Sequence, residues 1–287
     1  MRTIDGRNAE ATGGRNIEAI GAGNYGGAGT HRISLIWRSF VHMLKFIKAD
    51  MMLLAAGISP FMIGAVIRFG IPFCEKLLTE FTKTPEILGP YYSLFDILYS
   101  AITPVVFCFV TAMVMLEEHD DHIDRYLFVT TLGRGGYFAS RIGLPSLIAF
   151  VVTAALLPVF ALSDLSVAEI VFLAIAGTLQ GITIALIVVG FSANKLEGMA
   201  LTKISSLLML GAIAPYFIPT PYGYLLSFMP SYWTGMVITE KSPFFMAPSI
   251  VVAAVWIAVL AKRCNLRTLS RNKADFSRKW NKNMLRK

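Results

Sequence analysis

Residues 167–191 read VAEIVFLAIAGTLQGITIALIVVGF, a run of 25 residues in which Glu169 is the one charged side chain. A helix crosses about 30 Å of hydrocarbon with about 20 residues, so this run is long enough to span a membrane. The chain contains six such apolar runs, this one included, and we expect a transmembrane helix at each. They cover roughly residues 51–69, 97–116, 144–162, 167–191, 204–218 and 245–261.

The composition of the whole chain agrees with a membrane protein. Of its 287 residues, 55% are apolar and only 15% are charged, against about 25% charged residues in soluble domains. The mean hydropathy is +0.61. So few charges would not cover the surface of a soluble globule, which argues against a soluble enzyme. We therefore predict an all-α membrane protein.

The basic residues predict how the chain is oriented. Seven Lys and Arg precede the first run, three lie in 117–143, two in 192–203 and ten from Lys262 onward, which makes 22 of 26. The opposite set of loops holds three, and cytoplasmic loops are enriched in such cations. We expect a multi-pass protein of the cytoplasmic membrane with both termini in the cytoplasm. Because the cations flank apolar runs, we expect no nucleic-acid partner.

Residues 31–48, HRISLIWRSFVHMLKFIK, have a basic amphipathic pattern. Apolar side chains recur at helical spacing from Ile33 to Ile47, and most of the cations fall between them. Such a helix lies in the membrane interface; the alternative is a cytosolic helix on a protein partner. Residues 1–30 are Gly-rich and 263–287 are basic, so we expect cytoplasmic tails on either side of a six-span membrane domain over 31–262.

Residues 219–243 are apolar and aromatic, but four prolines interrupt them. Proline removes a backbone donor and breaks a helix. A seventh span here would also place the ten C-terminal cations outside. We therefore expect a re-entrant or interfacial hairpin on the outer side before the last span, with its Tyr and Trp side chains in an aromatic belt.

The loop after the second run begins EEHDDHIDRYLFV, residues 117–129. Its mixture of charged and apolar side chains predicts a short amphipathic helix around Asp120–Phe128, held between two spans and suited to docking in a groove on a cytosolic partner. We expect this helix to break at Gly133 and Gly135-Gly136. The alternatives are a solvated acidic turn and a metal site, but the HExxH pattern is absent, and we expect no metal.

The sequence offers little chemistry of its own. No GxxxxGK[ST] motif occurs, so ATP would have to be bound by another chain. We expect no catalytic residues. Polar side chains within spans line a water-filled path or join helices. The candidates for a translocation path are Thr103, Thr111, Gln180 and Thr183.

The order of these features resembles a known family. Val129-Thr130-Thr131-Leu132, followed by Tyr137 and Arg141, is similar to the V-T-P-L-x-x-x-x-Y-x-x-x-K pattern after the second span of type-2 (type V fold) ABC exporter permeases. Thr131 stands in place of the usual proline. The resemblance covers residues 31–262.

Two further stretches are similar to the drug- and antibiotic-export branch of that family. They are NKLEGMALTK at 194–203 and Pro230-Ser231-Tyr232-Trp233 before the last span. The resemblance implies the membrane subunit of an ATP-driven exporter, which is not itself an enzyme. Its cargo would be amphiphilic: a drug, a lipid or a hydrophobic peptide.

The resemblance also implies partners. Two permease subunits, identical or different, would pair in membrane lipid above two cytosolic ABC ATPase subunits, which would hold ATP and Mg. The implied ATPase-docking residues are Glu117, Glu118, Asp120, Asp121, Arg125, Tyr126, Leu127 and Phe128. The implied outer gate comprises Tyr222, Pro230, Tyr232 and Trp233. The alternative is a membrane scaffold or immunity protein that acts through its basic tail.

Overall fold

The computed structural model describes residues 27–83 and 87–264, which leaves out most of both predicted tails. The described residues are nearly all helical and contain no strand. Six helical stretches are long and apolar enough to cross a membrane, which confirms the predicted fold class. They are Met51–Thr82, Gly89–Asp120, Gly133–Phe160, Val167–Phe191, Lys195–Phe217 and Pro243–Cys264.

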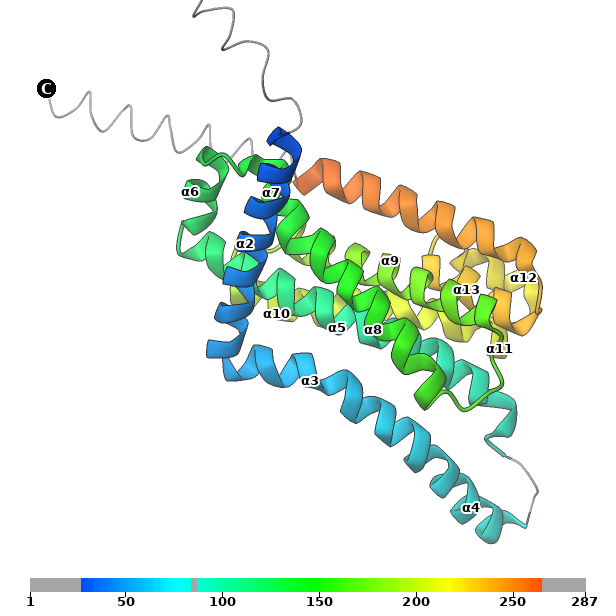
Figure 1. Ribbon diagram of the computed structural model, residues 1–287. Coiled ribbons are helices and arrows are strands. Elements are labelled where there is room, and N and C mark those ends of the chain that lie inside the picture. The colour runs from blue at the N-terminus through cyan, green and yellow to red at the C-terminus, as the bar shows by residue number, and fades with distance from the viewer. Residues whose placement is uncertain (1–26, 84–86, 265–287) are drawn as a thin grey trace, which may run out of the picture.

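The first helix, α2 (Gly27–Ala49), lies across one end of the bundle (Figure 1). It buries Phe40 and Met43 against the spans, while Trp37 remains 57% exposed. One side of α2 therefore packs on protein, and the other presents apolar and basic side chains outward, as an interfacial helix would.

The first span follows after a single residue. Asp50 caps α3 (Met51–Ala65), because its carboxylate accepts the Met52 N–H at 2.9 Å. A π-helical turn, Val66–Gly70, joins α3 to α4 (Ile71–Thr82). This long helix diverges from the rest of the bundle toward α4 (Figure 1).

The centre of the bundle is the pair α5 (Tyr92–Asp120) and α9 (Val167–Phe191), and a 3₁₀ turn at Gly89–Tyr91 leads into α5. Gly177 and Gly181 of α9 face α5 so closely that a Cβ at either would collide with a backbone carbonyl oxygen, that of Ser100 or Pro104. A GxxxG pair lets two helix backbones approach in this way.

The third span contains α7 (Gly133–Phe138), a π-helical turn at Ala139–Gly143 and α8 (Leu144–Phe160). The connection from α8 to α9 is attached to buried Asp96 of α5. The Asp96 carboxylate accepts the Leu162 N–H at 2.8 Å and the Ser163 N–H at 2.9 Å. These bonds hold the ends of three spans together.

The fifth span changes helix type. α10 (Lys195–Ser205) passes into a 3₁₀ helix, Ser206–Ile213, and then into α11 (Ala214–Phe217). Short elements follow, α12 (Thr220–Gly223) and a 3₁₀ turn at Tyr224–Leu226. Next come α13 (Pro230–Thr239), a 3₁₀ turn at Pro243–Phe245 and the last helix, 246–264.

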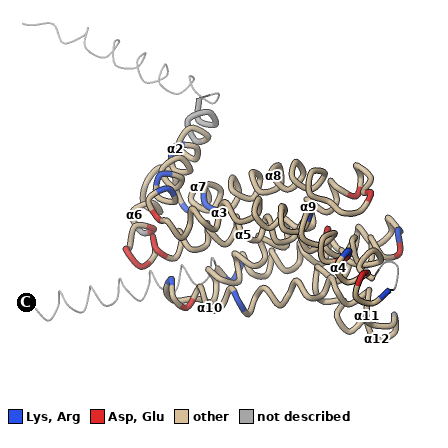
Figure 2. Tube along the Cα trace, turned by 90° about the horizontal axis from the view of Figure 1, so that it is seen from below, with Lys and Arg blue, Asp and Glu red and all other residues tan. Residues whose placement is uncertain are grey.

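The charged residues gather at the two ends of the bundle. Figure 2 shows Lys, Arg, Asp and Glu near α2, α6 (Ile123–Val129) and α10 at one end, and near α4 and α11 at the other. The middle of the bundle is almost free of them. This distribution suits a protein whose middle is surrounded by hydrocarbon.

Candidate functional site

The loop between the second and third spans forms a protruding helical elbow. α5 ends at Asp120, and His122 adopts a left-handed backbone conformation with φ of 62° that turns the chain into α6. The predicted helix around Asp120–Phe128 thus begins at Ile123 instead, because the reversal at His122 interrupts it. Figure 1 shows α6 beside α7 at the end where α2 lies.

The end of this short helix also differs from the prediction, which placed the break at Gly133 and Gly135-Gly136. Gly133, with φ of 63°, starts α7, and Gly135 and Gly136 lie inside that helix. The turn between the two short helices therefore lies at Thr130–Leu132. Of these three glycines, only Gly133 has the left-handed conformation that favours glycine.

α6 has an exposed apolar surface. Tyr126 is 76% exposed and Val129 is 89% exposed, whereas Leu127 and Phe128 are partly buried. The Phe128 ring packs edge-on against Tyr137, with ring centroids 5.1 Å apart. One face of α6 is thus fixed to the protein, and the opposite face lacks a partner among the described residues.

The acidic side chains predicted to dock a partner fall into two groups. Asp120 and Asp121 are exposed, whereas Glu118 is buried at 6% exposure. Glu117 is partly buried in an ion pair with Lys195. The side chain of Arg125 lies outside what the structure describes. The structure therefore brings only some of the eight residues to one surface.

Glu118 belongs to a buried polar cluster with Arg141, Tyr137 and Ser39. Arg141 Nε lies 3.1 Å and 3.0 Å from the two Glu118 carboxylate oxygens, and its Nη2 also donates to Glu118. Tyr137 donates its hydroxyl to Glu118 at 2.9 Å. Arg141 Nη1 donates to the Ser39 carbonyl oxygen of α2 at 2.8 Å. The cluster joins α2, the end of α5 and the start of the third span.

The π-helical turn at Ala139–Gly143 contains Arg141. Such turns insert one residue into a helix and often occur at functional sites. Arg141 is 1% exposed, and charges are rarely buried so deeply without a partner. The pairing with Glu118 supplies that partner.

Lys195 links the same end of the bundle from the other side. Its ammonium lies 2.6 Å from Glu117 and 3.2 Å from Asp50, and its backbone N–H donates to Asp120 at 3.0 Å. The hydrogen bond from Lys195 is the main reason that the pKa of Asp50 is lowered. The ion pairs of Lys195 therefore join the ends of α3, α5 and α10.

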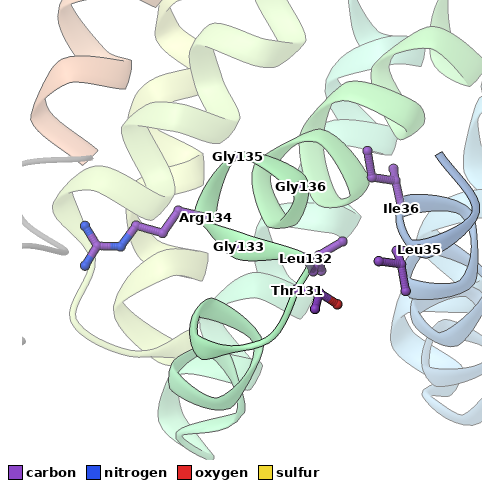
Figure 3. Close-up of a pocket in the computed structure, with 8 residues that line it drawn as sticks. All are labelled: Leu35, Ile36, Thr131, Leu132, Gly133, Arg134, Gly135 and Gly136. Atoms are coloured by element: carbon purple, nitrogen blue, oxygen red, sulfur yellow. The ribbon is translucent and has the colours of Figure 1, made fainter. Parts of the chain in front are cut away.

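A groove of about 410 Å³ lies between α2 and the turn that leads into α7. Figure 3 shows Leu35 and Ile36 of α2 on one side and Leu132 on the other, with Arg134 directed away from the groove. A Cβ added at Gly135 would contact nothing within 4 Å. Thr131, which stands where the family pattern has proline, also lines this groove.

The predicted path residues differ in what they bond. The hydroxyls of Thr103, Thr111 and Thr183 each donate to a carbonyl one turn earlier in their own helix. Gln180 is 3% exposed, and neither atom of its amide group has a hydrogen-bond partner among the described residues. Gln180 is thus the one of the four whose polar group is available to a guest.

The predicted gate residues lie in two environments. Tyr222 is 68% exposed, whereas Tyr232 is 1% exposed and packs inside the bundle, and Pro230 is also buried. Trp233 donates its indole N–H to the Ser227 carbonyl oxygen at 2.8 Å. The expected aromatic belt is therefore wrong for Tyr232, because α13 is packed among the spans instead of lying on their surface.

The described residues contain no group of three or more His, Cys, Asp or Glu placed to hold a metal ion. In the acidic loop, His119 Nδ1 lies 2.8 Å from Asp124 Oδ2. This contact joins the end of α5 to α6 and leaves one acid of the loop inside the elbow.

Comparison with known proteins assigns the chain to a family. Residues 43–262 match a family model described as Rv2686c-like, fluoroquinolones export permease protein. No curated protein and no solved structure matches the chain. The matched residues include all six spans apart from the last two residues of the sixth, and the match favours transport over a scaffold or immunity role.

Proposed function

Because the chain belongs to this family of export permeases, we propose that it is the membrane subunit of an ABC exporter whose ATPase is a separate chain. Two copies of the permease, or two related permeases, pair in the cytoplasmic membrane above two ATPase subunits. ATP and Mg are bound by the ATPases. The cargo is amphiphilic, and the description of the family makes a fluoroquinolone the first compound to try.

The observation that carries this proposal is the attachment of α6. This helix presents Tyr126 and Val129 outward, while the Glu118–Arg141 pair ties the adjoining ends of two spans together beneath it. A partner that binds the exposed face of α6 would therefore move α5 and the third span together. Short amphipathic helices dock in this manner into grooves on other proteins.

The orientation proposed here places α6, α2 and both termini in the cytoplasm. The excess of Lys and Arg on that set of segments supports it. α13 and the elements around Tyr222 then lie toward the outer face and form the gate. The path runs past Gln180, between α6 and this gate.

Co-purification tests the docking surface. The full chain is expressed with the ABC ATPase encoded beside it, and the complex is isolated in mild detergent. The double variant Tyr126→Ala, Val129→Ala should lose most of the bound ATPase, because it removes two exposed contact side chains. A matched control is Tyr222→Ala, an exposed tyrosine at the opposite end.

Two results would decide the matter. Retention of ATPase by the control and its loss from the α6 variant support the proposal. Equal recovery of ATPase with the wild-type chain and the α6 variant would show that the ATPase docks elsewhere.

A further inference from the structure

A small cavity lies between α5, α9, the 3₁₀ helix of the fifth span and α13. Its volume is about 20 Å³, which is enough for one water molecule or for one substituent of similar size. The polar side chains that line it are Gln180, Ser100, Ser231 and Thr234. No charged side chain lines it.

The hydroxyl groups that line this cavity already have hydrogen-bond partners, whereas the amide of Gln180 has none among the described residues. Ser100 donates to the Ile97 carbonyl oxygen at 2.7 Å and Ser231 donates to the Leu208 carbonyl oxygen, while Thr234 lies 3.1 Å from the Ser249 hydroxyl and 3.4 Å from the Pro230 carbonyl oxygen. The two serines can therefore offer a guest only lone pairs. The Gln180 amide adds two N–H donors and a carbonyl acceptor, none of which is bonded within the described residues.

A buried amide without partners is costly in an apolar environment, so its retention inside a membrane bundle needs a reason. Polar side chains at such depth mark substrate or ion pathways. Because no charge balances an ion here, the site suits a neutral group that both accepts and donates hydrogen bonds.

The two walls of the cavity differ in rigidity. On one side, Gly177 holds α9 against the backbone of α5. On the other side, Met209 and Ala212 belong to an eight-residue 3₁₀ helix. Runs of this helix longer than three or four residues are uncommon, and a stretch inside a longer helix often marks a hinge. The second wall is the one that can move.

We propose that the Gln180 cavity is the closed form of a binding site for a neutral hydrogen-bonding group of the cargo, such as a carbonyl, a carboxamide or a hydroxyl. This inference rests on the proposed function. The 3₁₀ wall moves outward to admit the rest of the cargo. Gln180 donates to and accepts from the bound group, and Ser231 and Thr234 add acceptor contacts from α13.

Binding of norfloxacin, a fluorescent fluoroquinolone with a ring carbonyl, tests this site. The full-length chain is reconstituted in nanodiscs and titrated as wild type, Gln180→Met and Thr178→Val. Methionine keeps the length of the side chain and removes the amide. Thr178 lies on the same helix, outside the cavity, with its hydroxyl bonded to Ala174 at 2.7 Å. We expect Gln180→Met to weaken binding about tenfold, the loss of one good hydrogen bond, with Thr178→Val unchanged.

Unchanged affinity in Gln180→Met would overturn the inference. If the wild type does not bind norfloxacin, the cargo class of the proposed function fails, and the site is then decided by cryo-electron microscopy of the chain in nanodiscs. Density for a guest or a water within hydrogen-bond distance of the Gln180 amide is the expected result. An amide with no such neighbour would overturn the inference independently of transport.

Discussion

Arg141 Nε lies 3.1 Å and 3.0 Å from the two carboxylate oxygens of Glu118, a residue 23 positions earlier in the chain. The two residues are 1% and 6% exposed. A buried pair contributes little net stability compared with apolar residues of the same size, but removal of one partner leaves a charge without compensation. The pair therefore fixes how α6 is attached to its spans.

Replacing Glu118 alone should destabilise the protein strongly. In Glu118→Gln the Arg141 charge stays buried without its counter-ion, at a cost of about 3–5 kcal/mol in the free energy of unfolding. Thermal unfolding in detergent measures this loss. Glu240→Gln, at an exposed glutamate, is the control and should unfold like the wild type; equal stability of both variants would contradict the structural role of the pair.

Replacing both partners should restore stability without restoring the coupling of ATP hydrolysis to export. The double variant Glu118→Met, Arg141→Met removes both charges from the buried site, so we expect it to regain much of the stability lost in Glu118→Gln. It should still hydrolyse ATP with its partner but export less cargo per ATP, because the end of α5 beside α6 has lost its ion pair with the third span. Normal export by this double variant would show that the link does not transmit motion.

The charges of the elbow sequence should set how the ATPase docks. Asp121→Lys combined with Arg125→Glu reverses two charges without removing apolar contact. We expect ATP hydrolysis that no longer drives export, since like-charge contacts disfavour the normal register. Asp164→Lys, an exposed acid in the α8–α9 connection, should leave coupling intact. Export at the wild-type rate by the elbow variant would show that these charges take no part in docking.

The close contact of α5 and α9 should not tolerate a methyl group. Gly177→Ala places a Cβ against the Ser100 carbonyl oxygen, and overpacking of this kind costs about 1–3 kcal/mol. Gly57→Ala is the matched control, because a Cβ there meets nothing within 4 Å. Thermal unfolding should separate the two; a stable Gly177→Ala protein would contradict the packing described.

Acid should weaken the contact between Asp50 and Lys195. The pKa of Asp50 is lowered, first by the hydrogen bond from Lys195, so its contribution to stability is present above the usual Asp pKa of about 4 and is lost as the pH falls through the lowered value. Below about pH 4 the wild type should therefore lose more stability than Lys195→Met. Parallel pH profiles of unfolding for the two proteins would count against this pairing.

The sequence predicts the spans well, because a run of about 20 apolar residues has few alternatives to a transmembrane helix. It does not predict the partners of single charges. Glu118 reads as part of a solvated acidic loop, yet it is buried, since its counter-ion lies on the next span. The role of Lys195 is missed for the same reason, because Asp50 and Glu117 are distant in sequence.

The close contact of α5 and α9 could have been predicted from the sequence. Gly177 and Gly181 form a GxxxG pair inside the apolar run 167–191, and this pattern indicates a close helix contact. The burial of Tyr232 had no such signal. Its surroundings are rich in proline and aromatic residues, and these suit an interface as well as a re-entrant helix.

Cysteine labelling in intact cells shows whether the α6 elbow faces the cytoplasm. Cys74 is exposed while Cys108 and Cys264 are buried, so Cys74→Ser provides a suitable background. Asp121→Cys and Asp164→Cys are compared with a maleimide that cannot cross membranes. We expect position 164 to react in intact cells and position 121 to react only after the membrane is opened. Reaction of position 121 in intact cells would contradict it.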